Sequence, residues 1–395
     1  MKTSEQLENK GHEPRSVVRS RATSFAVKAI GMVSALGPDA ATSCAAARAG
    51  ISRATPIEAF QLYSEEDWGN VGVIGHAANA VARGFEGFGK LVQLASGALV
   101  DLLSSHPIPV DEWPRIAICL AIPSAYFQAE LMAAQGMTDG ERDRAAEQIG
   151  LMLSSLVGRV CQLNSIPVNP SAQFLFAEDQ CGFAHGLAKA EELLGAGAFD
   201  RCIVGGVDAC TEGAAMSAAH HYNVLKAGEQ ASGYMPGEAA GWVMVESGNA
   251  AVGASPGVLA WIDAVAEAFE TVDRTSPKPA IGIGLAAAIM QCLAQSPAVA
   301  ADVGWLIGDL NGDAFRANDW GYALSRLVSD HPWLGRSPLV LPAESFGEVG
   351  AAAGPVATCV AVRAFARGYA PAPTALVWLA SYRGQRAAFL IRQGS

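Results

Sequence analysis

FLFAEDQCGFAHGLAKAEELLGAGAFDRCIVGGVD, residues 174–208, is the stretch that decides the fold. Its apolar start, FLFA, ends in Glu178, Asp179 and Gln180, and from Gly182 onward apolar residues recur at helical spacing. Glycines end this helix, and CIVGGVD has the character of a second buried strand. The stretch therefore predicts a strand, a sharp turn, a helix and a strand. A side chain at the turn lies at a helix N-terminus, where backbone N–H groups favour an oxyanion or a thiolate.

The composition is that of a densely packed globular protein. Of the 395 residues, 51% are apolar and 16% are charged. The 27 Lys and Arg against 38 Asp and Glu give a net charge of −11, which argues against a nucleic-acid partner. The eight cysteines lie singly in apolar segments, without a C-x-x-C pair or the spacing of a zinc site. We therefore expect buried reduced thiols, a cytoplasmic protein, and neither a metal nor a cofactor.

Three other segments bear on the organisation of the chain. Residues 1–23 are polar and of mixed charge, without the apolar run of a secretory signal, so we expect a disordered lead-in. The charge-free stretch 280–301 is interrupted by Gly, Gln, Ser and Pro, which favours a buried helix over a membrane span. Small residues at 248–257 predict a link between two halves, 24–250 and 257–395.

Strands and helices alternate along both halves, a pattern that predicts mostly parallel sheets covered by helices. A doubly wound nucleotide-binding fold is the alternative, but no G-x-G-x-x-G or P-loop motif follows a predicted strand. Residues 123–165 are predicted to be mainly helical, with Asp139 as a helix cap. The other predicted strands are 25–36, 115–122, 303–308, 339–341, 376–379 and 387–391, and the other helices are 40–48, 91–104, 285–293, 318–328 and 351–367.

The central stretch resembles the nucleophile region of the β-ketoacyl-acyl carrier protein synthases, members of the thiolase-like superfamily, whose catalytic cysteine lies on such a turn. The family pattern continues with a helix, a glycine, an acidic residue and a Gly-Gly pair in a buried strand. Counting back without a gap from Gly205 and Gly206 places Gln180 at the nucleophile position. Aligning Cys181 instead needs a one-residue deletion that turns the apolar face of the helix by roughly 100°. Gln180 is therefore preferred, and Cys181 is the alternative nucleophile.

The resemblance extends over residues 25–391. FAVKAIGMVSAL resembles the opening strand "ITGMGVVSPLG" of these synthases, and GYMPGEAAGWVMVES resembles their "GFVLGEGAG" segment. The resemblance implies a thiolase-like, α-β-α-β-α layered α/β fold built from two pseudo-repeated halves.

Condensation in the resembled family needs a thiolate, two histidine N–H donors and backbone amides around an oxyanion. In the segments that match the histidine loops, WLIGDLNGDAFRAND and PAESFGEVGAAAG, Asp309 and Glu348 take the histidine positions and Ala343 takes the place of a lysine. A carboxylate repels an enolate unless burial keeps it protonated. We therefore expect the site to be unsuited to condensation. The seven histidines are His12, His76, His106, His185, His220, His221 and His331.

The last signature of the family, a "GFGGTN" loop, appears as SYRGQR at residues 381–386. Tyr382 takes the place of the gating phenylalanine, and Gly384 is the glycine that remains. Arg383 and Arg386 are interpreted as surface residues, or alternatively as partners of the cleft carboxylates. The candidate substrate-binding residues implied by the resemblance are Tyr382, Gly384, Phe346 and Glu178.

Three functions remain open. The first is a non-condensing subunit in an acyl carrier protein-dependent fatty acid or polyketide pathway, because chain-length factors of this family carry glutamine for cysteine and pair with an active synthase. The second is an acyltransferase or hydrolase of altered chemistry, using Cys181 or paired carboxylates. The third is a pure adaptor. Expected partners are a second copy or an active synthase, and an acyl carrier protein. Glutamine-bearing malonyl decarboxylase domains keep both histidines, so Asp309 and Glu348 argue against decarboxylation.

Overall fold

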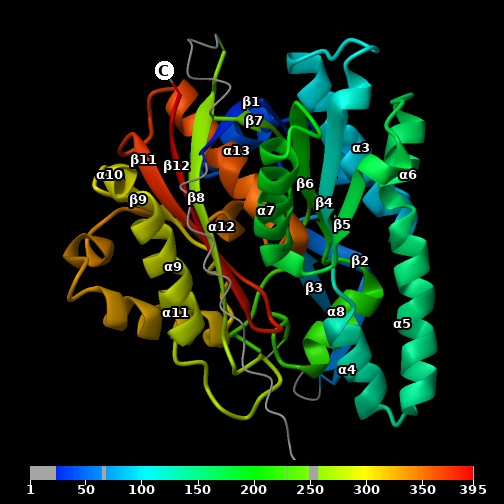
Figure 1. Cartoon of the computed structure of the whole chain (residues 1–395). Helices are drawn as coiled ribbons and strands as arrows, with labels where there is room; N and C mark the ends of the chain where they lie inside the picture. Colours follow the sequence, from blue (N-terminus) through cyan, green and yellow to red (C-terminus); the bar gives the residue numbers. More distant parts are fainter. Residues whose placement is uncertain (1–23, 65–67, 229, 249–256, 395) are drawn as a thin grey trace, which may run out of the picture.

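The computed structural model describes residues 24–64, 68–228, 230–248 and 257–394, and its strands form one large sheet and one hairpin (Figure 1). The ten strands of the large sheet have the order β10-β9-β11-β12-β8-β1-β7-β6-β4-β5. This order consists of two sets, β5-β4-β6-β7-β1 and β10-β9-β11-β12-β8. In both sets the strands follow the same pattern along the chain: third, second, fourth, fifth, first. The repeat confirms the predicted fold of two pseudo-repeated halves.

The two sets meet at β1 and β8, which pair antiparallel and bring Ser24 opposite Asp263. Helices α7 and α13 lie between the two sets of strands, because each contacts strands of both (Figure 1). Helix α3 covers the outer face of the first set, and α9 covers that of the second, with α11 packed against α9. These contacts produce the layered arrangement of the thiolase-like fold.

The bounds of the strands follow. They are β1 Ser24–Ser34, β2 Thr55–Ser64, β3 Gly69–Gly75, β4 Ile116–Ala121, β5 Gln173–Phe176, β6 Arg201–Ala209, β7 Glu238–Ser247, β8 Ala260–Phe269, β9 Val303–Ile307, β10 Leu339–Val340, β11 Thr374–Ala380 and β12 Gln385–Gln393.

The α-helices and the short 3-10 helices complete the described chain. The α-helices are α1 Ala40–Arg48, α2 Asn79–Ala82, α3 Gly87–Ser105, α4 Tyr126–Ala134, α5 Asp139–Ser154, α6 Leu156–Leu163, α7 Gly182–Gly195, α8 Gly213–His221, α9 Ile283–Gln295, α10 Pro297–Ala300, α11 Ala314–Leu327, α12 Ala343–Phe346 and α13 Ala353–Ala366. The 3-10 helices are η1 Trp113–Arg115, η2 Pro170–Ala172, η3 Asp179–Cys181, η4 Pro332–Gly335 and η5 Gly350–Ala352.

Close packing around β6 explains the Gly205-Gly206 pair. A Cβ atom on Gly206 would lie 2.0 Å from the carbonyl oxygen of Ala351, and one on Gly205 would lie 2.2 Å from the Trp242 ring. Real side chains cannot come so close, so both positions need glycine. Gly206 therefore lets η5, at the start of α13, touch the strand that follows α7, and Gly205 makes room for the Trp242 ring of β7.

Several predicted boundaries shift in the structure. The helix predicted at 318–328 begins earlier, at Ala314, because the Asp313 side chain accepts a hydrogen bond from the Phe315 amide and caps it. Asp139 is not the cap of α5: Thr138 is, in a capping box with Glu141. The β2–β3 hairpin was not predicted.

Three predictions concern the N-terminal segment, the link between the halves and the stretch 280–301. The lead-in 1–23 lies outside the described residues, as does most of the 248–257 link, so the limits of the two halves stay predictions. Stretch 280–301 contains α9 and α10. Within the described residues, no helix combines the length and apolar character needed to cross a membrane.

Candidate functional site

The candidate site lies where strand order reverses in each half. Strand β4 lies between its parallel neighbours β5 and β6, and β9 lies between its parallel neighbours β10 and β11. Ligands of α/β proteins bind beyond the carboxyl ends of strands at such points. Gln180 follows β5 in η3, Asp309 follows β9, and Glu348 precedes η5. The topology thus brings three residues from distant parts of the sequence to one place.

Glu348 is the centre of a buried hydrogen-bond network. Its Oε1 accepts from Gln180 Nε2 at 3.0 Å and from the Gly350 amide at 2.7 Å, and its Oε2 accepts from Asn311 Nδ2. Both Gln180 and Glu348 are buried. Both carboxyl oxygens of Glu348 thus accept hydrogen bonds from N–H groups, which is the role of a carboxylate. The amide of Gln180 is therefore fixed by its carboxylate neighbour, and its own Oε1 is buried without a hydrogen-bond partner.

Asp309 joins this network through Arg316, a residue that sequence reasoning did not identify. Arg316 Nη1 lies 2.8 Å from Asp309 Oδ1 and 3.3 Å from Glu348 Oε2. The second oxygen of Asp309 accepts from the Ala380 amide at 2.9 Å. Arg316 is only 3% exposed, so the charges interact away from water. Its position inside the quoted WLIGDLNGDAFRAND segment was the signal that could have revealed it.

The two arginines of the SYRGQR segment differ in their surroundings. Arg386 is not a surface residue: it is 1% exposed and its Nε lies 2.6 Å from Asp319 Oδ2. It therefore does not provide the partner of Asp309 or Glu348 that the alternative interpretation expected. Arg383 is exposed, as the surface interpretation predicted.

Burial raises the pKa of two carboxyl groups near the network to about 7. They are Asp309, despite the attraction of Arg316, and Asp208, despite the hydrogen bond from the Ala351 amide. Burial also raises the pKa of Asp179, whose oxygens accept from the Ser124 amide at 2.7 Å and the Ser124 hydroxyl at 2.6 Å. Desolvation disfavours the charged form of each group, so part of the negative charge expected in the cleft is neutralised by protons near pH 7.

Cys181 is poorly suited to act as a nucleophile. It is 1% exposed, its Sγ lies 3.6 Å from the carbonyl oxygen of Leu379, and burial raises the pKa of the thiol to about 12. Its amide donates to Ser381 Oγ at 3.0 Å. Because the thiolate is the nucleophilic form, this environment opposes the chemistry that the alternative alignment would need.

The four candidate substrate-binding residues do not lie together in the structure. The Tyr382 hydroxyl accepts from Asn311 Nδ2 at 3.0 Å, so this side chain belongs to the network. The Glu178 carboxyl group lies against the His185 ring, whose pKa is lowered by burial, and Phe346 is buried in the core. Gly384 has φ of 112°, and a Cβ there would lie 2.6 Å from the Glu270 carbonyl oxygen. Of these residues, the contacts bring only Tyr382 to Glu348 and its donors.

A buried histidine also lies closer to the site than the sequence suggested. His76 is inaccessible to solvent, and a Cβ on Gly347 would lie 2.8 Å from its Cδ2. Burial lowers the pKa of His76, so it is neutral at pH 7. His76 thus lies beside the loop of Glu348, although it does not take part in the hydrogen bonds of that carboxylate.

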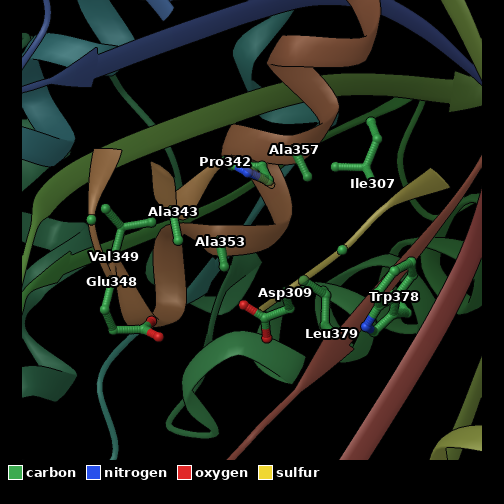
Figure 2. Close-up of a pocket in the computed structure, with 12 residues that line it drawn as sticks. Ile307, Asp309, Pro342, Ala343, Glu348, Val349, Ala353, Ala357, Trp378 and Leu379 are labelled. Atoms are coloured by element: carbon green, nitrogen blue, oxygen red, sulfur yellow. The ribbon is translucent and has the colours of Figure 1, made fainter. Parts of the chain in front are cut away.

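A small pocket opens beside the two carboxylates (Figure 2). Figure 2 shows Asp309 and Glu348 turned toward each other, with Trp378 and Leu379 on one side and Ala343 and Ala353 on another. The cavity has about 20 Å³, room for about one water molecule. The twelve residues that line it include neither cysteine nor histidine. In the part of the chain that the structure describes, no group of three or more His, Cys, Asp or Glu is arranged to hold a metal.

Comparison with known proteins identifies the fold. No family model and no curated protein matches the sequence. Solved structures do match, among them "AntDE:AntF (apo)", a type II polyketide acyl-carrier protein in complex with its ketosynthase, over 95% of this chain and 100% of the other at TM-score 0.73 and 14% identity. The chain has the ketosynthase fold.

Two further solved structures extend the comparison. The ishigamide ketosynthase/chain length factor matches over 94% of this chain and 100% of its own at TM-score 0.65 and 18% identity. The ketosynthase ApeO in complex with its chain length factor ApeC from Xenorhabdus doucetiae matches over 94% and 98% at TM-score 0.65 and 13% identity. At these identities the likeness establishes the fold, and function has to be argued from the site.

The raised pKa values predict an unusual dependence of stability on pH. Asp208 has a pKa of about 7 in the folded chain against 3.8 without its environment, so between these values the folded state holds more protons than the unfolded state. The contribution of Asp208 to the free energy of unfolding is therefore fully present below about pH 4 and is lost as pH rises through about 7. Three pKa units correspond to about 4 kcal/mol. We therefore expect Asp208→Asn to reduce the loss of unfolding free energy between pH 4 and pH 8 by up to about this amount.

Urea unfolding at the two pH values measures this difference. Asp302→Asn, which changes an exposed carboxylate, is the matched control and should leave the slope unchanged. The slope is compared rather than the absolute stability, because asparagine cannot accept both the Ala209 and the Ala351 amide hydrogen bonds equally well. Equal slopes in the wild type and Asp208→Asn would contradict the assignment.

Proposed function

We propose that the chain is a non-condensing, synthase-like subunit that pairs with an active ketosynthase in an acyl carrier protein-dependent pathway. The observation that carries this proposal is the hydrogen bond from Gln180 Nε2 to Glu348 Oε1. At the turn where a synthase needs a thiolate, this chain has an amide that is bonded to a carboxylate. The amide cannot act as the nucleophile that accepts an acyl group, and the carboxylate has no N–H to donate to an enolate.

The comparisons support a partnership of this kind. Two of the matching structures are described as a ketosynthase with a chain length factor, and a third as an acyl-carrier protein in complex with its ketosynthase. A pure adaptor remains the second candidate, because the same closed network would suit it. The raised pKa of Cys181 argues against an acyltransferase that uses this thiol.

The native mass of the complex isolated from its own host tests the partnership. A heterodimer of this chain with a ketosynthase that has its cysteine and both histidines is the expected result. A homodimer as the sole species, with no ketosynthase bound, would refute the proposed pairing and favour the adaptor.

Restoring a thiol at the turn tests the non-condensing assignment. We expect Gln180→Cys to form no β-ketoacyl product from acyl and malonyl thioesters, because each missing donor costs about two to three orders of magnitude in rate. Glu348 Oε1, 3.0 Å from the amide nitrogen that the substitution removes, also raises the pKa of a thiol placed there and slows its acylation. This opposes the activation expected from the helix N-terminus alone.

Product is followed by chromatography and the acyl adduct by intact mass. The variant Gln180→Cys with Cys181→Ala serves as the control that assigns any adduct to position 180. Condensation by Gln180→Cys at the rate of an ordinary synthase would show that Asp309 and Glu348 do not impede the chemistry. Condensation by the wild type would end the non-condensing proposal.

A further inference from the structure

Arg316 reaches from the first turn of α11 into the middle of the candidate site. Its side chain is 3% exposed, and Nη1 also donates to the Asp309 carbonyl oxygen at 3.1 Å. The guanidinium carbon lies 4.4 Å from the centre of the Tyr382 ring. One nitrogen therefore contacts the two carboxylates, while the guanidinium carbon lies over the ring in a cation–π contact.

These contacts join segments that are far apart in the sequence. Arg316 contacts the loop after β9 through Asp309, the loop before α13 through Glu348, and the β11–β12 turn through Tyr382. Asn311 reinforces the same links, because its Nδ2 contacts both Glu348 and the Tyr382 hydroxyl. Through Glu348 the network continues to Gln180. The segments that carry Asp309, Glu348 and Tyr382 are therefore all held to one guanidinium group.

The charges in this region favour a cation at that point. Asp309 and Glu348 contact Arg316 directly, and Asp179 and Asp208 lie close enough for Glu348 to influence their ionisation. Two buried carboxylates brought together without a counter-charge repel each other strongly. The guanidinium group therefore neutralises the centre of the site as well as filling it.

We propose that Arg316 is the internal occupant of this cleft: its guanidinium group fills the space between Asp309, Glu348 and Tyr382 and keeps the loops closed over Gln180. The contact is autoinhibitory, since a ligand can enter only where Arg316 leaves. The cavity of about 20 Å³ that remains beside Asp309 and Glu348 is too small for an acyl group. This inference goes beyond the proposed partnership and does not depend on which protein binds the chain.

The proposal predicts a specific form of chemical rescue. Arg316→Ala leaves a flat space bounded by two carboxylates and a tyrosine ring, and free guanidinium ion matches that space. We expect guanidinium chloride, up to about 20 mM, to raise the melting temperature of Arg316→Ala along a saturable curve, as a bound ligand does. Sodium chloride at equal ionic strength and methylammonium chloride, whose cation is not planar, should give a smaller rise or none.

The wild type and Arg336→Ala, which removes an exposed arginine side chain, are the matched controls and should show no saturable response. If Arg316→Ala does not fold, the same guanidinium titration is done on Arg316→Ala combined with Asp309→Asn. The second substitution removes one of the two carboxylates that Arg316→Ala leaves unpaired. A saturable response to guanidinium confined to the Arg316 variants supports the proposal. No response in a folded variant, or the same response in the wild type, overturns it and leaves the partnership proposal unaffected.

Discussion

Leu175→Asp is expected to prevent this chain from pairing through β5, with a second copy or with a ketosynthase, and to give monomers or insoluble protein. Leu175 lies in β5, the last strand of the sheet order, so one edge of β5 has no neighbouring strand within the described chain. Its other edge pairs with β4, where Leu175 lies opposite Leu120. The strand reads QFLF, and its apolar side chains are only partly buried. An unpaired apolar edge strand is a template for pairing with another chain.

The surroundings of β5 strengthen this expectation. Helix α6 packs beside the strand, and Leu163 at the end of this helix is an apolar side chain that is 58% exposed. In the resembled synthases this strand pairs with its counterpart across the dimer and joins the two sheets. A buried aspartate at position 175 would lack a partner there, and a stable dimer tolerates an unpaired buried charge poorly.

Light scattering of the purified variant decides the prediction. Leu339→Asp is the matched control, because Leu339 lies in β10, the strand at the opposite end of the sheet, and is 38% exposed. We expect this control to keep the mass of the wild type. A dimer unchanged by Leu175→Asp would show that β5 is not part of the contact.

Much of the fold could be predicted because the residues that begin and end a helix or strand lie next to it in the sequence. The helix predicted at 40–48 has the bounds Ala40–Arg48, since Asp39 caps it and Gly50 follows it. Prediction failed where a segment is held in place by contacts with residues that are distant in the sequence. The β2–β3 hairpin forms the smaller sheet, and its partly buried residues pack on a cluster containing Tyr234 and Tyr382. No local pattern in the sequence predicts the contact of the hairpin with this cluster.

The site could be predicted in part for the same reason. Ungapped alignment pointed to Gln180, Asp309 and Glu348, and the structure brings these three side chains into one network. Arg316 was missed because arginine is ordinarily an exposed residue, and because the predicted helix began only at residue 318. Only the folded chain shows that its helix turns this side chain inward, toward a carboxylate seven positions earlier and another 32 positions later.

Arg386→Ala is expected to destabilise the chain more than any exposed ion-pair variant. Arg386 and Asp319 form a pair with side chains 0% and 1% exposed, and Arg386 Nη1 also donates to the Ser381 carbonyl oxygen at 2.8 Å. Removing one partner leaves the other as an unpaired buried charge, which typically costs about 3 to 5 kcal/mol. Ser381 Oγ in turn donates to the Glu178 carbonyl oxygen, so the loss reaches the turn of Gln180.

Denaturant unfolding compares this variant with Arg115→Ala. The Arg115–Asp200 pair has side chains 50% and 63% exposed, so water screens it and its loss should cost far less stability. Arg386→Met combined with Asp319→Leu removes both charges and should recover most of the stability lost by Arg386→Ala, because no unpaired charge remains. Equal stability of Arg386→Ala and Arg115→Ala would mean that water reaches Asp319 once the guanidinium is gone. In that case the segment from Ser381 to Arg386 is less rigid than its buried hydrogen bonds indicate.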